Sequence, residues 1–154
     1  MMRKLAFALA VVVCFVVETR LAPAGLRLNL TLLPVYWAGL RHGPARGLLT
    51  GALVGAALDS ISGGILGPSM LGKGLAGYLA SLMTGGLFRW TPVLGLLGLA
   101  VLTVADGAVS YASLAAFAQA PAPAGEAALA IAAQGVMNSI AGLYIRPDHE
   151  AGEL

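Results

Sequence analysis

The chain has 154 residues, of which 58% are hydrophobic and only 10% are charged, and its mean hydropathy is +0.86. A water-soluble domain carries about 25% charged residues, so this composition excludes a soluble domain of the same size. The formal net charge of +2 is too small for a nucleic-acid-binding surface. We therefore expect an all-α integral membrane protein with a single domain over residues 1–154.

The first apolar run, residues 5–21, has features of a signal peptide, because basic residues precede it and small residues follow it. Glu18 and Arg20 interrupt the approach to the cleavage site, so we expect a span that is retained. The second run, residues 26–40, contains Asn29 and Pro34, and the sequence leaves open whether it crosses completely.

A membrane-crossing helix needs about 20 apolar residues, and four further runs approach this length. Together with the first two they predict a bundle of six transmembrane helices. The four runs are residues 45–66, 69–88, 92–118 and 126–145.

Six spans bring both termini to the same side of the membrane. Basic residues are in excess in cytoplasmic loops, and more of the lysines and arginines fall on the side of the termini. The sequence therefore predicts cytoplasmic N and C termini. The basic residues on the side of the termini are Arg3, Lys4, Arg41, Arg46, Arg89 and Arg146, and those on the opposite side are Arg20, Arg27 and Lys73.

Glycines form a ladder in the third run. Residues four apart lie on one face of a helix, and small residues on such a face let a second helix approach closely. The fourth run repeats the spacing with Lys73 and Gly77, and the sixth has Asn138 in a similar stripe. The ladder is open to two interpretations, packing within the chain or docking of a partner's helix. Its members are Gly43, Gly47, Gly51 and Gly55, continued by Asp59, Gly63 and Gly67.

Three ionisable residues lie within or close to the predicted spans, where a charge usually faces a partner or a cavity. Asp59 and Lys73 flank a hairpin, and an ion pair between them would fix its geometry. The alternatives are solvation of Asp59 at its helix end and extension of Lys73 to the membrane interface. For Asp106 we expect a hydrogen bond to Asn138 or Gln134, with a proton-relay role as the alternative.

No other pattern indicates catalysis. His42 and His149 are isolated, which does not make a metal site, and no nucleotide-binding fingerprint is present. We expect a protein that is not an enzyme and has no cofactor and no metal.

Three consecutive segments carry a resemblance to a known family. They are the glycine-rich stretch 51–59 that ends in Asp59, the turn 62–67, and the helix 71–82 with its Gly77-Tyr78-Leu79 patch. Together they resemble the rod shape-determining protein MreD. The resemblance implies a multi-pass scaffold in the bacterial inner membrane, within the cell-elongation complex that builds peptidoglycan.

The same resemblance implies the partners and the fold. The direct partner would be MreC. RodA and a class B penicillin-binding transpeptidase would bind either directly or through MreC. The MreB cytoskeleton would be an indirect partner. The fold would be similar to the S components of energy-coupling-factor vitamin transporters. Such an S component is the alternative function. Its docking patch would correspond to Ala6 and Ala10, and the polar residues Asp59, Ser62, Ser69 and Lys73 would line its vitamin pocket.

Under the scaffold interpretation, the small-residue face of the third and fourth runs is the expected interface for the membrane span of MreC. The candidate interface or structural residues are Gly47, Gly51, Gly55, Asp59, Gly63, Gly67, Lys73, Gly77, Asp106 and Asn138.

Overall fold

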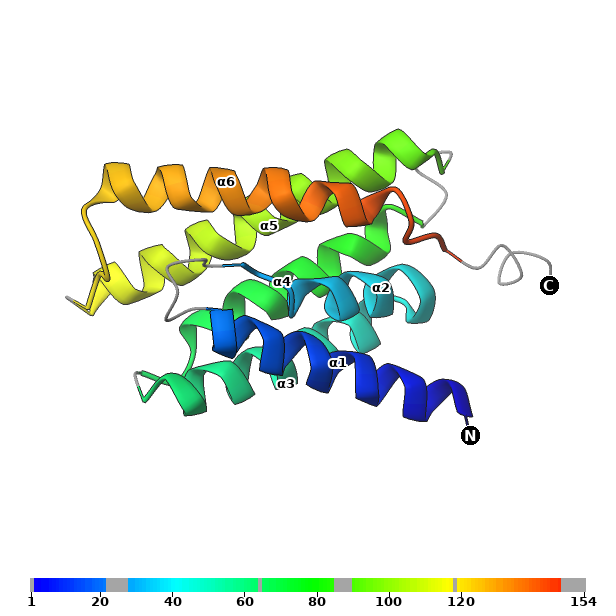
Figure 1. Ribbon diagram of the computed structural model, residues 1–154, viewed down its shortest axis with the longest axis horizontal. Helices are drawn as coiled ribbons and strands as arrows, with labels where there is room; N and C mark the ends of the chain where they lie inside the picture. Colours follow the sequence, from blue (N-terminus) through cyan, green and yellow to red (C-terminus); the bar gives the residue numbers. More distant parts are fainter. Residues whose placement is uncertain (1, 22–27, 64, 85–89, 118, 148–154) are drawn as a thin grey trace.

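The computed structural model describes residues 2–21, 28–63, 65–84, 90–117 and 119–147, and within these ranges the chain forms six helices and no strand. Successive helices run in alternate directions, so α1 begins and α6 ends at the same end of the bundle (Figure 1). This all-helical fold was predicted. The helices are α1 (Met2–Leu21), α2 (Leu32–His42), α3 (Pro44–Ser62), α4 (Pro68–Leu82), α5 (Pro92–Ala116) and α6 (Ala124–Gly142).

Proline and glycine set the helix ends. Helices α3, α4 and α5 each have proline in the first turn, where its missing N–H would have no partner within the helix. Gly63 ends α3 with a φ of 65°, in the left-handed conformation that glycine adopts without strain. Gly67 precedes α4 with a φ of 135°, which a residue with a side chain rarely adopts. These two glycines therefore shape the turn between α3 and α4.

The glycine ladder of α3 packs against α4 of the same chain. A Cβ atom added at Gly47, Gly51 or Gly55 would collide with the α4 backbone at Gly77, Lys73 and Ser69, respectively. The ladder thus forms a contact between two helix backbones, as small-residue faces do. Of the two interpretations of the ladder, packing within the chain is the one that agrees with this contact, because α4 occupies the face.

A second contact of the same kind joins α5 to α6. Gly95 and Gly142 face each other so closely that a Cβ atom on either would collide with the carbonyl oxygen of the other. Helix α4 lies at the centre of the bundle, in contact with α2, α3 and α5, whereas α1 packs lightly and mainly against α2 (Figure 1). The main apolar core includes Leu32, Val35, Tyr36, Leu40, Ala80, Leu99 and Leu102.

The lengths of the helices leave the six-span prediction unconfirmed. Among the described residues, only α5 is both long and apolar enough to cross a membrane by length and composition. Helix α2 has 11 residues and begins at Leu32, six residues later than expected. At 1.5 Å per residue it extends about 16 Å, roughly half of a bilayer core of about 30 Å. Glycine and polar residues lower the mean hydropathy of α3 and α6.

The outer surface of the bundle is nonetheless strongly apolar. Leu5 on α1, Leu53 on α3, Val101 on α5 and Leu129 on α6 are each between 64% and 74% exposed. Water-soluble monomers rarely expose apolar patches that extend over several elements. This surface is suited to contact with lipid or with other membrane helices.

Two glycine-to-alanine variants test the α3–α4 contact. Gly51→Ala should lower the free energy of unfolding by about 1–3 kcal/mol, because its new methyl group overpacks against the α4 backbone at Lys73. Gly74→Ala should be neutral or stabilising by up to about 1 kcal/mol, because its nearest neighbour would lie at 3.6 Å and alanine favours a helix. Unfolding of the purified protein in mixed detergent micelles measures both, and equal losses would contradict the close backbone contact.

Candidate functional site

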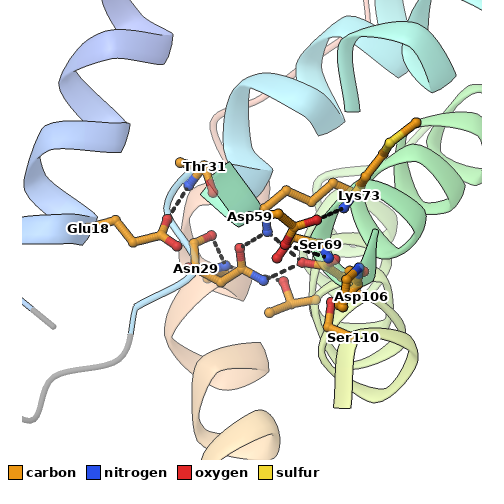
Figure 2. A network of polar contacts seen from close by, with 12 residues as sticks. Glu18, Asn29, Thr31, Asp59, Ser69, Lys73, Asp106 and Ser110 are labelled. Atoms are coloured by element: carbon orange, nitrogen blue, oxygen red, sulfur yellow. Dashed lines mark hydrogen bonds and ion pairs between the residues drawn. The ribbon is translucent and has the colours of Figure 1, made fainter. Parts of the chain in front are cut away.

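A buried ion pair lies at the centre of the bundle. The Lys73 ammonium group is 2.8 Å from Oδ2 of Asp106, and the two residues are only 4% and 2% exposed. Asn29 completes a triangle, since its side-chain oxygen accepts a hydrogen bond of 2.7 Å from Lys73 and its Nδ2 donates one of 2.6 Å to Asp106 Oδ2. Figure 2 shows these three side chains pointing toward one another.

Three different elements bring this triangle together. Lys73 lies in the second turn of α4, Asp106 lies midway along α5, and Asn29 lies in the segment that precedes α2. Gly72 gives the Asp106 carboxylate its space, because a Cβ atom at this position would collide with Oδ1. That oxygen is buried and has no hydrogen-bond partner among the described residues, so the carboxylate binds through Oδ2.

Helix α6 joins the network through Asn138. Its Nδ2 donates to the backbone carbonyl of Asn29 at 2.8 Å and lies 3.3 Å from the hydroxyl oxygen of Thr103. Thr103 is fully buried on α5 and donates to the Leu99 carbonyl oxygen at 2.7 Å. We name the five residues of this set, Asn29, Lys73, Thr103, Asp106 and Asn138, the central polar network. It joins α4, α5, α6 and the segment before α2.

Asp59 has a separate structural role at the start of α4. Its carboxylate accepts hydrogen bonds from the backbone N–H groups of Gly67, Ser69 and Met70, at 2.9, 3.1 and 3.2 Å. The first N–H groups of a helix have no partner within it, and a carboxylate there also interacts favourably with the helix dipole. Asp59 thus caps α4 from the last turn of α3.

Helix α1 is linked to the same region by a single carboxylate. Glu18 accepts a hydrogen bond of 2.9 Å from the backbone N–H of Thr31, two residues beyond Asn29. The Phe7 ring stacks on Trp37 of α2 with a centroid distance of 5.1 Å. These two contacts position α1, which otherwise packs lightly.

The charged pairing differs from the sequence prediction. Lys73 pairs with Asp106 and not with Asp59, because the α4 backbone at Lys73 lies against Gly51 while its side chain reaches toward α5. Asn138 was expected to bond to Asp106 directly, but it reaches the ion pair through Asn29. The buried positions of Lys73 and Asp106 leave neither residue at an outer interface.

The sequence prediction missed Asn29 and Thr103 as members of the network. An asparagine inside an apolar run is itself a signal of a buried polar contact, and Asn29 carried that signal. Thr103 carried no such signal in the sequence. Its hydroxyl bonds to its own helix, as the hydroxyls of threonines in apolar helices commonly do.

The chemistry of the network is that of a structural bond. Each charged group is neutralised by its partner and further held by an amide, and removal of one member would leave the other charge buried without compensation. Within the described ranges, no three His, Cys, Asp or Glu side chains come together as a potential metal site. The network therefore supplies a fixed connection between helices.

An apolar exterior combined with a charged, fully internal network defines this chain as a helical bundle of the membrane-associated class. The model of the rod shape-determining protein MreD family matches residues 1–137. The chain therefore belongs to the MreD family, which confirms the resemblance carried by the glycine-rich hairpin. MreD is a membrane-associated, shape-determining family and not a known enzyme family. Searches of curated proteins and of solved structures gave no significant match.

The ion pair can be tested by a double-mutant cycle. Lys73→Met should destabilise the fold by about 3–5 kcal/mol, because it leaves the Asp106 carboxylate buried and unpaired. Adding Asp106→Asn removes that charge and should recover most of the loss. Denaturant titration in mixed micelles gives the coupling energy, and simple addition of the two single losses would show that the residues do not interact.

The cap of α4 makes a different prediction. Asp59→Ala should cost about 0.5–2 kcal/mol and accelerate amide hydrogen exchange at the start of α4, from Gly67 to Leu71. Ser62→Ala, in the same last turn of α3, removes a hydroxyl that bonds only to Leu58 and serves as the control. The charge swap Asp59→Lys with Lys73→Asp should not restore stability, and a rescue would contradict the separate roles assigned to the two residues.

Proposed function

We propose that this chain is a multi-pass scaffold of the bacterial inner membrane that binds MreC and supports the RodA and transpeptidase pair. The observation that carries the proposal is the division of the molecule into an apolar exterior and a polar interior whose charges are bound to one another. Because Lys73 and Asp106 neutralise each other inside the bundle, the exposed apolar helix faces are the surfaces that we assign to function. Family membership supplies the cell-shape role within which such a scaffold works.

The distribution of charge supports an orientation with cytoplasmic termini. Arg41, Arg46 and Arg146 lie at the end of the bundle where α1 begins and α6 ends. Cytoplasmic ends of membrane proteins carry the excess of arginine and lysine. The short helix α2 fits the same picture, because its polar leading segment, with Asn29 and Thr31, is buried inside the protein. Irregular backbone at membrane depth is tolerated where protein covers it.

The contacts of Asp59 and Lys73 count against the vitamin-transporter alternative. Asp59 and Lys73 would have supplied polar groups to such a pocket, but both side chains are buried and bonded within the chain. In a scaffold, the observed contacts of these residues would hold α3, α4 and α5 in fixed relative positions. The contacts therefore favour the scaffold over a substrate-binding subunit.

We place the MreC contact on the outer face of the α3–α4 pair. The ladder glycines Gly47, Gly51 and Gly55 act indirectly there, because they join the two helices into one unit. At the level of this contact, Leu53 of α3 is 72% exposed and Leu75 of α4 is 43% exposed. Apolar side chains of this kind can pack against a single membrane helix, with van der Waals contact as the driving force.

Site-specific photo-crosslinking in cells tests this function. A photoreactive residue at Leu53 or Leu75 should crosslink to MreC, and one at Val136 on α6, which is 69% exposed, should not. Depletion of the protein should round rod-shaped cells, and the crosslinkable variants should restore the rod shape. Crosslinks only from Val136 would contradict the assigned face.

Absence of a crosslink from each of the three positions, in cells that keep their shape, would contradict direct binding to MreC. Release of a stoichiometric small molecule from the purified protein would instead favour the S component.

A further inference from the structure

Helix α1 has the weakest attachment to the bundle among the described helices. None of its side chains from Leu5 to Arg20 is buried, whereas each of the other five helices contributes buried residues. It packs mainly against α2, and Figure 1 shows it on the outside of the bundle. Elements with few buried contacts open at a lower free-energy cost than the core of a protein. We therefore expect α1 to be the first helix to separate.

Two contacts anchor α1 at positions far apart along the helix. The Phe7 ring stacks on Trp37 of α2 with 5.1 Å between the ring centroids. The Glu18 carboxylate accepts a hydrogen bond of 2.9 Å from the Thr31 N–H, and Figure 2 shows this side chain extending from α1 to the start of α2. The anchors are eleven residues apart, or about 16 Å along the helix. Between them, Val11 packs against the apolar core while remaining only partly buried.

An apolar groove of about 390 Å³ lies between α1 and α2. Its α1 wall consists of Ala6, Ala10 and Cys14, which share one face of the helix because they are four residues apart. Its α2 wall includes Leu33 and Pro34. The small face of α1 therefore stands apart from α2, whereas the glycine faces of α3 and α6 touch the backbone of a neighbouring helix.

Glu18 is the polar anchor of α1. The Thr31 N–H lies at the start of α2, where a backbone donor has no acceptor within the helix and where a negative charge interacts favourably with the helix dipole. The Thr31 hydroxyl is buried and has no hydrogen-bond partner among the described residues, which costs free energy. The attached position of α1 thus depends on one charged hydrogen bond and carries an opposing cost beside it.

The start of α2 is held in place independently of α1. The Asn29 side chain bonds to Lys73 and Asp106, and the Asn29 carbonyl accepts a hydrogen bond from Asn138. These contacts connect the segment before α2 to α4, α5 and α6. Loss of the bond to Glu18 therefore frees α1 without removing the support of α2.

We propose that α1 is a strap with two positions. In one position Glu18 latches it to the start of α2, and in the other the latch is broken and α1 has moved away into the membrane while α2 to α6 remain folded. Release separates the small face of α1 from the Trp37 wall of α2, so both apolar faces become open to another membrane helix. The strap rests on the membrane location proposed above but not on the identity of a partner.

Distances between spin labels in lipid vesicles test the two positions. In a Cys14→Ala background, which removes the single native cysteine, the labels are placed at Leu9→Cys on α1 and Val136→Cys on α6, at positions 64% and 69% exposed. The intact latch should give one main distance. Glu18→Ala should raise the ratio of released to latched molecules about tenfold or more, because a hydrogen bond to a charged group contributes a factor of this order. Glu18→Gln keeps an uncharged acceptor and should give an intermediate ratio.

Further variants serve as control and amplification. Glu126→Ala removes an exposed carboxylate from the first turn of α6 and should leave the main distance unchanged. Phe7→Ala combined with Glu18→Ala removes both anchors and should make the released distance dominant. Amide hydrogen exchange at Leu99 and Thr103 in α5 should stay slow in every variant, because the strap moves without unfolding the bundle.

The possible results separate the strap from the proposed function. An unchanged single distance in the double variant of Phe7 and Glu18 would overturn the strap and leave the membrane scaffold intact. Accelerated exchange at Leu99 and Thr103 in Glu18→Ala would also overturn it, by showing that Glu18 stabilises the whole bundle. Failure of the unmodified protein to enter vesicles would instead contradict the membrane location itself.

Discussion

The buried contact between Lys73 and Asp106 is the interaction on which the arrangement of the helices depends. A charge without a partner at this depth costs several kcal/mol. The fold is therefore stable only when the helices bring Lys73 and Asp106 into contact. Asn29 binds both, and Asn138 binds the backbone of Asn29. Four parts of the chain are therefore placed by the requirement that one ammonium and one carboxylate remain paired.

The glycine contacts are the second constraint, and they make the first one geometrically possible. Without side chains at Gly47, Gly51 and Gly55, α3 and α4 approach until their backbones touch. That contact fixes the rotation of α4, which directs Lys73 toward α5. Gly72 then leaves room for the Asp106 carboxylate against the same helix. Small residues thus act by determining where the few charged residues lie.

This organisation divides the described part of the chain into a polar interior and an apolar exterior. Hydrogen bonds and the ion pair hold the central polar network together, whereas the outer surface of the bundle is apolar. The lightly packed α1 differs from the rest, since Glu18 and the Phe7–Trp37 stack are its main connections. On its α2 side it borders an apolar groove lined by Ala6, Ala10 and Trp37.

The sequence by itself determined the helical class, the approximate position of each helix and the family. Long apolar runs bounded by proline and glycine leave few alternatives to helices, and the hairpin from Gly51 to Leu82 carries the family pattern. It also marked Asp59, Lys73 and Asp106 as residues that need partners. The start of α2 was predicted too early, because Asn29 precedes the helix and satisfies a tertiary contact instead.

Only the tertiary structure decided which partner each charge has and which face each glycine covers. Helical spacing shows that residues share a face, but the direction of that face depends on rotation about the helix axis. That rotation is set by contacts with residues distant in the chain, such as Gly51 with Lys73. For this reason the pairing of Lys73 with Asp106, and the capping of α4 by Asp59, emerged only when the helices were placed together.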